Sequence, residues 1–138
     1  MNNKELINKA IEAMTQSYSP YSNFMVGAAL LTSSGKVYTG CNIENASFSP
    51  TNCAERTAFF KAISEGERGF SKIAVVGGIN GNITDYTFPC GVCRQVMREF
   101  CNDDFFVIIA KTEDDYFEYK LSELLPHSFT SSDLGGEL

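Results

Sequence analysis

Two short, continuous apolar runs do most to limit the folds open to this chain. One covers residues 72–77 and the other covers 105–110. Apolar runs of this length are typical of strands that are buried on both faces. Helical patterns at 53–65 and from Pro89 to about Phe100 lie on either side of the first run. Strands that alternate with helices predict an α/β layered domain around one mixed sheet, with these two strands near its centre.

The other expected elements are shorter or more exposed. They are a helix at 4–16, a hairpin of strands at 24–32 and 36–41, a strand at 116–119 and a helical turn at 121–125. The first helix is predicted from apolar residues at helical spacing, and the hairpin from a Ser-Ser-Gly turn between its two strands. The 138 residues contain no repeat and no linker. We therefore expect a single domain over 1–138, with a mobile polar tail after about residue 130.

Charge and cysteine usage exclude several classes of protein. A formal net charge of −6 argues against a nucleic-acid partner, because phosphates repel an acidic surface. No apolar run approaches the length that crosses a bilayer, and residues 1–6 are unlike a secretion signal, so we expect a cytoplasmic protein without a membrane partner. The five cysteines are an odd number. In a reducing compartment such cysteines more often bind metal, catalyse or pack as small apolar groups than form disulfides.

Three of the cysteines stand where helices are expected to begin. Cys90 and Cys93 form a C-x-x-C pair directly after Pro89, and Cys53 opens the helix predicted at 53–65. Exposed N–H groups at a helix N-terminus stabilise thiolates, so two such termini pointing at one place favour a metal there. Three protein ligands leave a tetrahedral zinc with one open position for water, which is the mark of a catalytic site.

Glu55 and Arg56 follow Cys53 closely enough to act on the same metal. The Glu55 carboxylate can hang over the open position, take a proton from water and deliver it to the substrate. Three thiolates leave a divalent zinc with a net negative charge, which weakens it as an electrophile; Arg56 and the helix dipoles would offset that charge. Taken alone, Glu55 also fits an acidic residue at a helix start, and Arg56 a solvated helix residue.

These segments together resemble the small, homotetrameric cytidine deaminases. The matching segments cover nearly the whole chain: Tyr18–Phe24, Gly40–Ser47, Cys53–Glu55, Pro89–Gln95 and Leu124–Pro126. The resemblance implies a three-layer α/β/α sandwich around one mixed, roughly five-stranded sheet. It also implies one Zn²⁺ per subunit, hydrolytic deamination of cytidine and 2′-deoxycytidine with release of ammonia, a role in pyrimidine salvage, and a homotetramer.

The resemblance also assigns residues to the substrate. Asn42 and Glu44 match the pair that hydrogen-bonds the ribose 3′ hydroxyl, and alternate residues of an extended segment do face the same way. Phe24 matches an aromatic that packs beside the nucleoside, and the backbone N–H of Ala54 would hold the pyrimidine carbonyl. Phe129 matches an aromatic that reaches the site of a neighbouring subunit. Outside the resemblance, Asn42 and Glu44 fit a polar loop turn, and Phe24 fits the core.

The sequence departs from the family pattern near the expected pocket. Phe48 stands where a tyrosine is common, and Phe88 stands where a small hydroxyl residue is common. The loop at 80–88 is also somewhat long. We expect Phe88 to narrow the base pocket.

Three other functions remain open from the residues. A deaminase of an aminopyrimidine nucleoside antibiotic would use the same scaffold, although Asn42 and Glu44 favour a free ribose. A structural zinc module would need a fourth ligand, from Cys41, Cys101 or His127. A redox dithiol would use only the C-x-x-C pair and would leave the earlier cysteine and its neighbouring glutamate without a role.

Overall fold

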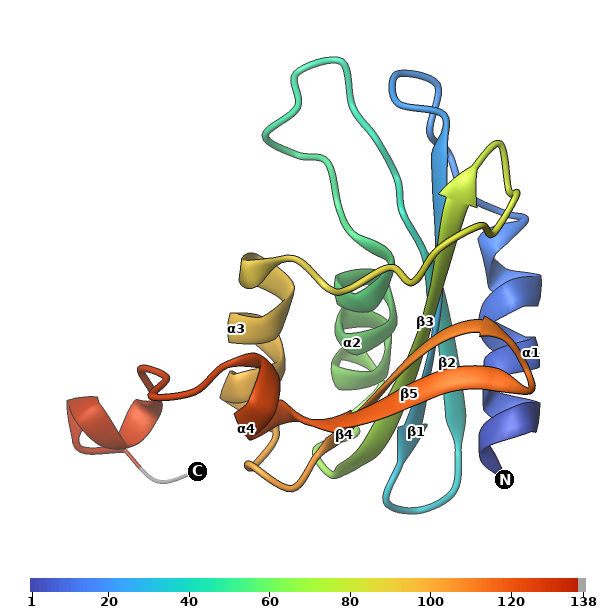
Figure 1. Cartoon of the computed structure of the whole chain (residues 1–138). Helices are drawn as coiled ribbons and strands as arrows, with labels where there is room; N and C mark the ends of the chain where they lie inside the picture. The colour runs from blue at the N-terminus through green and yellow to red at the C-terminus, as the bar shows by residue number, and fades with distance from the viewer. Residues whose placement is uncertain (137–138) are drawn as a thin grey trace.

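The computed structural model describes residues 1–136, which form one mixed sheet with helices on both faces (Figure 1). Residues 137–138, the end of the expected mobile tail, lie outside the described residues. The helices are α1 (Asn3–Met14), α2 (Ala54–Ser64), α3 (Gly91–Phe100), α4 (Leu121–Leu124) and the 3₁₀ helix η1 (Ser131–Leu134). The strands are β1 (Phe24–Thr32), β2 (Val37–Cys41), β3 (Phe70–Ile79), β4 (Phe106–Thr112) and β5 (Asp115–Lys120).

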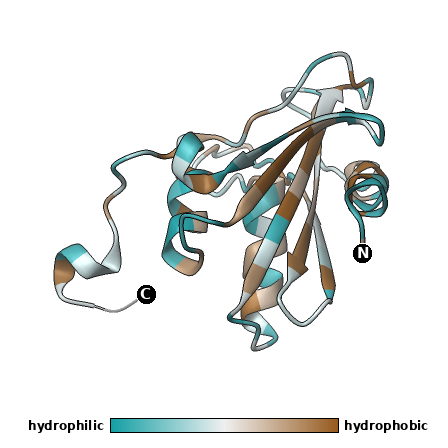
Figure 2. Cartoon of the chain, turned by 60° about the horizontal axis from the view of Figure 1, so that its bottom comes forward, coloured by the Kyte–Doolittle hydropathy of each residue, from teal (hydrophilic) through white to brown (hydrophobic). Residues whose placement is uncertain are grey.

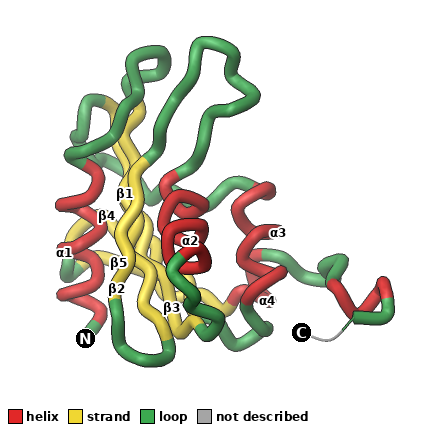
Figure 3. The backbone as a smooth tube through the Cα atoms, turned by 180° about the vertical axis from the view of Figure 1, so that it is seen from behind, coloured by secondary structure: helices red, strands yellow, loops and turns green. Residues whose placement is uncertain are grey.

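The five strands lie in the order β2-β1-β3-β4-β5. β3 and β4 run parallel, and every other neighbouring pair is antiparallel. α1 covers one face of the sheet, and α2 and α3 cover the other, as Figure 3 shows from behind. The expected three-layer sandwich around a five-stranded mixed sheet is thus confirmed, and both continuous apolar strands lie inside the sheet rather than at its edges.

The apolar runs are continuous because each strand contributes side chains to two hydrophobic cores, one on each face of the sheet. In β3, Ile73 and Val75 pack under α2 and α3, whereas Ala74 and Val76 pack under α1. All four side chains are fully buried. Figure 2 shows the hydrophobic stretches running along the strands between the helical layers. Alternate residues point to opposite faces of a strand, so a strand covered on both faces has no polar positions to offer.

Several predicted boundaries differ from the structure by one or two residues, and two of these differences have a clear physical cause. β3 extends beyond 72–77 to Ile79, because its last residues pair with the start of β1, Ile79 opposite Phe24. α3 begins at Gly91 rather than Pro89, because Cys90 is extended and acts as the N-cap. The side chain of Cys90 thereby occupies the end of the helix and not its first turn. Within residues 1–136, no helix has both the length and the apolar character needed to span a membrane.

Candidate active site and metal centre

The start of α2 is fixed by polar contacts around Cys53. Cys53 is the N-cap residue, with extended backbone dihedrals, and α2 begins at Ala54. Just before it, Asn52 forms an isolated β-bridge with Ile43, and its amide donates to the Thr57 hydroxyl at 3.0 Å. Thr57 donates in turn to the carbonyl of Cys41, also at 3.0 Å. The Cys53 thiol is therefore held at a defined place beside the end of β2.

The start of α3 is fixed in a similar way. The Cys90 sulfur lies 3.4 Å from the backbone N–H of Cys93 and caps the helix. Arg94 donates through Nε to the carbonyl of Pro89 and through Nη1 to that of Leu124, both at 2.8 Å. These bonds join the segment before the helix to α4. The sulfurs of Cys90, at the N-cap, and Cys93, in the first turn, are thereby brought close together.

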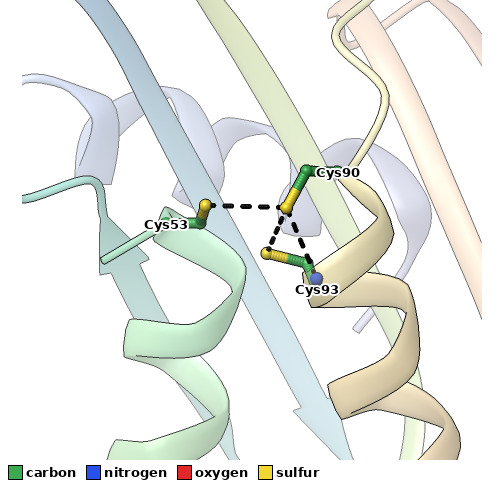
Figure 4. A group of neighbouring side chains, drawn as sticks. All are labelled: Cys53, Cys90 and Cys93. Carbon is green, nitrogen blue, oxygen red and sulfur yellow. Dashed lines mark hydrogen bonds between the residues drawn. The ribbon is translucent and has the colours of Figure 1, made fainter. Parts of the chain in front are cut away.

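The three predicted metal ligands meet (Figure 4). The Sγ atoms of Cys53 and Cys90 are 3.9 Å apart, those of Cys90 and Cys93 are 3.5 Å apart, and all three lie within 4.8 Å of one another. A tetrahedral zinc with Zn–S bonds of about 2.3 Å would separate its sulfurs by roughly 3.8 Å. The spacing and the soft thiol donors both fit zinc. Among the described residues, Cys41 and Cys101 are not part of this group.

The charges around these sulfurs favour a bound cation. The pKa of Cys53 is lowered to about 5 by hydrogen bonding with Cys93 and by Arg56, whose Nη2 donates to the Cys53 sulfur at 3.1 Å. The same contact with Cys53, together with burial, raises the pKa of Cys93. Ionisation of the Cys53 thiol thus makes ionisation of the Cys93 thiol less favourable. A divalent metal between the sulfurs would stabilise all of them as thiolates.

Glu55 lies one residue inside α2 and is buried, with 4% of its surface exposed. Burial, with a smaller contribution from the Cys53 thiolate, raises the pKa of its carboxyl to about 7. A positive ion at the three sulfurs would favour its ionised form. A carboxyl in such surroundings can accept and release a proton near neutral pH, which is what general acid–base chemistry requires.

A cavity of about 220 Å³ opens beside the thiols and the carboxyl. The predicted site residues that line it are Phe24, Asn42, Cys53, Ala54, Glu55 and Cys90. Phe88 also lines it, as expected from its place before Pro89. Sequence reasoning did not single out Val26, Thr51, Asn52 and Thr87, which complete the lining. Val26 had a usable signal, because it alternates with Phe24 on β1 and must share its face.

Glu44 lies in a second hollow of about 380 Å³, which it lines with Tyr21, Ser22, Phe48 and Thr51. Thr51 lines both spaces, so the two adjoin. The carboxylate of Glu44 accepts from the backbone N–H groups of Tyr21 and Ser22, at 2.9 and 3.1 Å, and from the Ser22 hydroxyl. The hydroxyl bond is the largest cause of its lowered pKa. Glu44 is therefore an ionised hydrogen-bond acceptor in a fixed position.

Asn42 lines the cavity of about 220 Å³, which we call the inner cavity, and its side-chain amide makes only some of its possible hydrogen bonds within the chain. Its Nδ2 donates to the carbonyl of Phe24 at 2.7 Å, and its Oδ1 accepts from the N–H of Val26 at 2.9 Å and from the Ser17 hydroxyl. An amide carries two N–H donors, so one hydrogen remains for a ligand. Asn42 and Glu44 thus line two adjoining spaces.

Phe129 lies outside the cavity. Its backbone carbonyl accepts from Gln95 on α3 at 2.9 Å, and its side chain is 59% exposed. It belongs to the C-terminal segment, which extends away from the sheet and helices in Figure 1. Within this chain it is not brought together with the other predicted site residues.

Comparison with known proteins gives a consistent result. Residues 1–109 match the family described as the cytidine and deoxycytidylate deaminase zinc-binding region. A cytidine deaminase of Sporosarcina psychrophila is 48% identical over 97% of this chain and 96% of its own length. A cytidine deaminase of Halalkalibacterium halodurans is 50% identical over 97% of this chain and 98% of its own length. The crystal structure of a cytidine deaminase from Burkholderia pseudomallei superposes with a TM-score of 0.86 at 45% identity, covering 94% of this chain and 100% of that one.

Proposed function

The chain belongs to the cytidine and deoxycytidylate deaminase zinc-binding family, and on that premise we propose that it deaminates cytidine and 2′-deoxycytidine by hydrolysis. The C4–N bond of the base breaks, a C4–O bond forms, and uridine or 2′-deoxyuridine is released with ammonia. The observation that carries the proposal is the meeting of three thiols beside a buried carboxyl at the edge of a cavity. When bound, zinc supplies a Lewis acid that makes water nucleophilic near neutral pH.

We assign Cys53, Cys90 and Cys93 as the zinc ligands and Glu55 as the residue that moves protons. Glu55 takes a proton from the attacking water, passes it to N3 of the base, and carries a second proton to the leaving amino group. Its burial and its raised pKa support this role, because one carboxyl must act as base and then as acid. Arg56 supports the site by offsetting the charge of the thiolates.

The shapes of the two adjoining spaces support a nucleoside as substrate. The inner cavity takes the base beside the thiols, with the ring against Phe24 and the pyrimidine carbonyl on the N–H of Ala54. That N–H lies in the first turn of α2, where a helix leaves its donors free. The sugar then extends from the inner cavity, where Asn42 has a free amide hydrogen, toward the second hollow, where Glu44 offers its carboxylate, and the two hold the ribose hydroxyl.

We further propose a homotetramer in which Phe129 of one copy reaches the site of another. The exposure of Phe129, and of Phe48 at 72%, supports an interface with a further copy. We place this single-domain protein in the cytoplasm, because five free thiols, three of them grouped as metal ligands, need a reducing compartment. A nucleoside substrate and a uridine product place it in pyrimidine salvage.

The proposal is tested by incubating zinc-loaded protein with cytidine and with 2′-deoxycytidine. We expect uridine or 2′-deoxyuridine and ammonia in equal amounts. A Cys90→Ser variant, which removes one ligand, serves as the control and should lose both zinc and activity. The absence of product with zinc fully bound would refute the proposal. A higher kcat/KM for an aminopyrimidine nucleoside antibiotic than for cytidine would favour the rival substrate.

A further inference from the structure

Residues 85–89, which we call the strap, form the last part of the connection between β3 and α3 (Figure 1). The strap has no helical or strand hydrogen bonding, and it ends at the metal-ligand candidate Cys90. Two of its residues, Thr87 and Phe88, line the inner cavity. Apart from the bond that Arg94 donates to the carbonyl of Pro89, little holds the strap backbone, so side-chain contacts must select the path that places these two residues.

Tyr86 makes most of those contacts. Its hydroxyl donates to Oδ1 of Asp115 at 2.5 Å. Its ring packs against the ring of Phe117, with centroids 5.0 Å apart and planes at 59°. The ammonium of Lys111 lies 4.6 Å from the centre of the same ring. Lys111, Asp115 and Phe117 all belong to the hairpin of β4 and β5, and we call them the clasp.

The clasp acts close to the cavity wall. Thr87 follows Tyr86 directly and lies so near β3 that a Cβ added to Gly77 would be 2.8 Å from its hydroxyl and 3.0 Å from the ring of Phe24. The Phe88 ring packs against Tyr119 of β5, with centroids 5.8 Å apart. Thr87 and Phe88 therefore lie directly after the residue that the hairpin holds. Thr87 also lies beside the same bare position of β3 as Phe24, the aromatic residue proposed to pack beside the substrate.

We propose that Tyr86 is a positioning residue for substrate binding: held by the clasp, it fixes Thr87 and Phe88 as one wall of the cavity. The inference rests on the proposed function, because it takes the cavity to be the nucleoside site. Tyr86 itself is not among the residues that line the cavity, so it acts through its two neighbours. The thiols and Glu55 are carried by the starts of α2 and α3. Loss of the clasp should therefore weaken binding and spare the chemical step.

Kinetics of two single variants test the hydrogen bond. Tyr86→Phe and Asp115→Ala each remove it and should raise KM for cytidine about fivefold, with kcat within about twofold of wild type. The double variant should be no worse than either single one, because both delete the same contact. Asp115→Asn keeps an acceptor oxygen and should restore KM to nearly the wild-type value. Tyr86→Ala removes the ring contacts as well and should raise KM by at least about tenfold.

Three further measurements separate positioning from general stability. The dissociation constant for uridine, measured by direct titration, should rise in step with KM while bound zinc stays at the wild-type level. Tyr116→Phe is the matched control: Tyr116 lies on β5 next to Asp115, but its hydroxyl accepts from Asn3, the first residue of α1, on the other face of the sheet. That variant should leave KM unchanged. A merely structural role for Tyr86 would lower the melting temperature without moving KM.

The outcomes distinguish this inference from the proposed function. A wild-type protein that fails to deaminate cytidine overturns the proposed function. An active wild-type protein whose Tyr86→Ala and Asp115→Ala variants keep the normal KM and uridine affinity overturns the positioning role alone. Additive effects in the double variant would also overturn the positioning role, and so would a loss of zinc with KM unchanged.

Discussion

The surroundings of the Glu55 carboxyl follow from the position of this residue at the start of α2. It follows the N-cap residue of α2 by two places, so the helix turns it inward toward the cavity, where it is almost fully buried. An exposed glutamate at the same helix start would do no more than stabilise the helix dipole. The helix start was predictable from the sequence, but the burial of this side chain comes from tertiary packing, which the local pattern at a helix start does not report.

We predict that Glu55→Gln keeps the metal and loses the activity. The amide has nearly the same shape but cannot take up a proton, and proton transfer by a positioned group contributes about 10²–10⁴ in rate. We expect kcat to fall by at least about a thousandfold with one zinc still bound, as measured by metal analysis and ammonia release. Glu65→Gln, an exposed change at the other end of α2, is the control. Substantial remaining turnover would show that another group moves the proton.

Arg56 offers a second prediction for a single residue. Its guanidinium donates to the Cys53 sulfur at 3.1 Å, and its removal leaves the negative charge of the thiolates without that counterweight. We expect Arg56→Gln to lower kcat by on the order of tenfold while zinc remains bound. Arg68→Gln removes an equal charge that contacts only the backbone carbonyls of Ile63 and Glu67, and should have no such effect. Equal rates for the two variants would assign Arg56 to a solvated surface role.

At the scale of elements, local sequence patterns explain a strand whose bounds were predicted correctly, and a pairing partner explains one whose end was not. β1 was predicted at 24–32 and has those bounds, because its apolar residues and the turn after it mark both ends. β3 continues past the end of the predicted run at 72–77, because β1 pairs with Gly78 and Ile79, although glycine has a low strand propensity of its own. A pattern in one segment cannot report a partner some fifty residues away in the chain.

Gly40 shows how closely β2 and α2 approach. A Cβ at this position would lie 2.4 Å from the carbonyl oxygen of Ala54 and 2.6 Å from the nitrogen of Ala58, both backbone atoms of α2. Neither atom can move without the helix. Helix α2, which begins after Cys53 and contains Glu55, thus packs directly against a position of β2 that has no side chain.

We therefore predict that Gly40→Ala shifts α2 and disturbs the site. We expect a loss of stability of about 1–3 kcal/mol, as for other overpacked cores, together with weaker zinc binding. Thermal melting and competition with a chelator would measure the two effects. Gly91→Ala is the matched control for stability, since a Cβ there meets nothing within 4 Å. A Gly40→Ala protein with normal melting and zinc affinity would mean that the helix adapts at no cost.

For the molecule as a whole, the metal should contribute to stability as well as to catalysis. It would join two helices whose ligands come from separate parts of the chain, and it would neutralise sulfurs that repel one another as thiolates. The sequence was sufficient to predict that these three thiols meet, because their types and spacing are specific. It was not sufficient to predict the clasp, because Tyr86 meets residues of a hairpin that lies beyond α3.

Removal of zinc is expected to abolish activity and to lower the melting temperature by at least about 5 °C, because a ligand bound only by the folded state stabilises that state. Added zinc should restore both properties. Differential scanning calorimetry with parallel assays, before and after treatment with a strong chelator, would measure this. Cys41→Ser, a change outside the thiol group, should behave as wild type does. Full activity in protein shown to be free of metal would rule out the metal's role.

The placement of β3 between the two ligand-bearing helices has a consequence for biosynthesis. One of the three thiols precedes this strand and two follow it, so the shortest stretch of the chain that contains all three, residues 53–93, also contains the whole of β3. A nascent polypeptide emerging from the ribosome has only one of the three sulfurs until β3 has also emerged. Capture of the ion must therefore await the docking of α2 and α3 on the same side of the sheet. Metal uptake would therefore report the moment at which these two helices have docked.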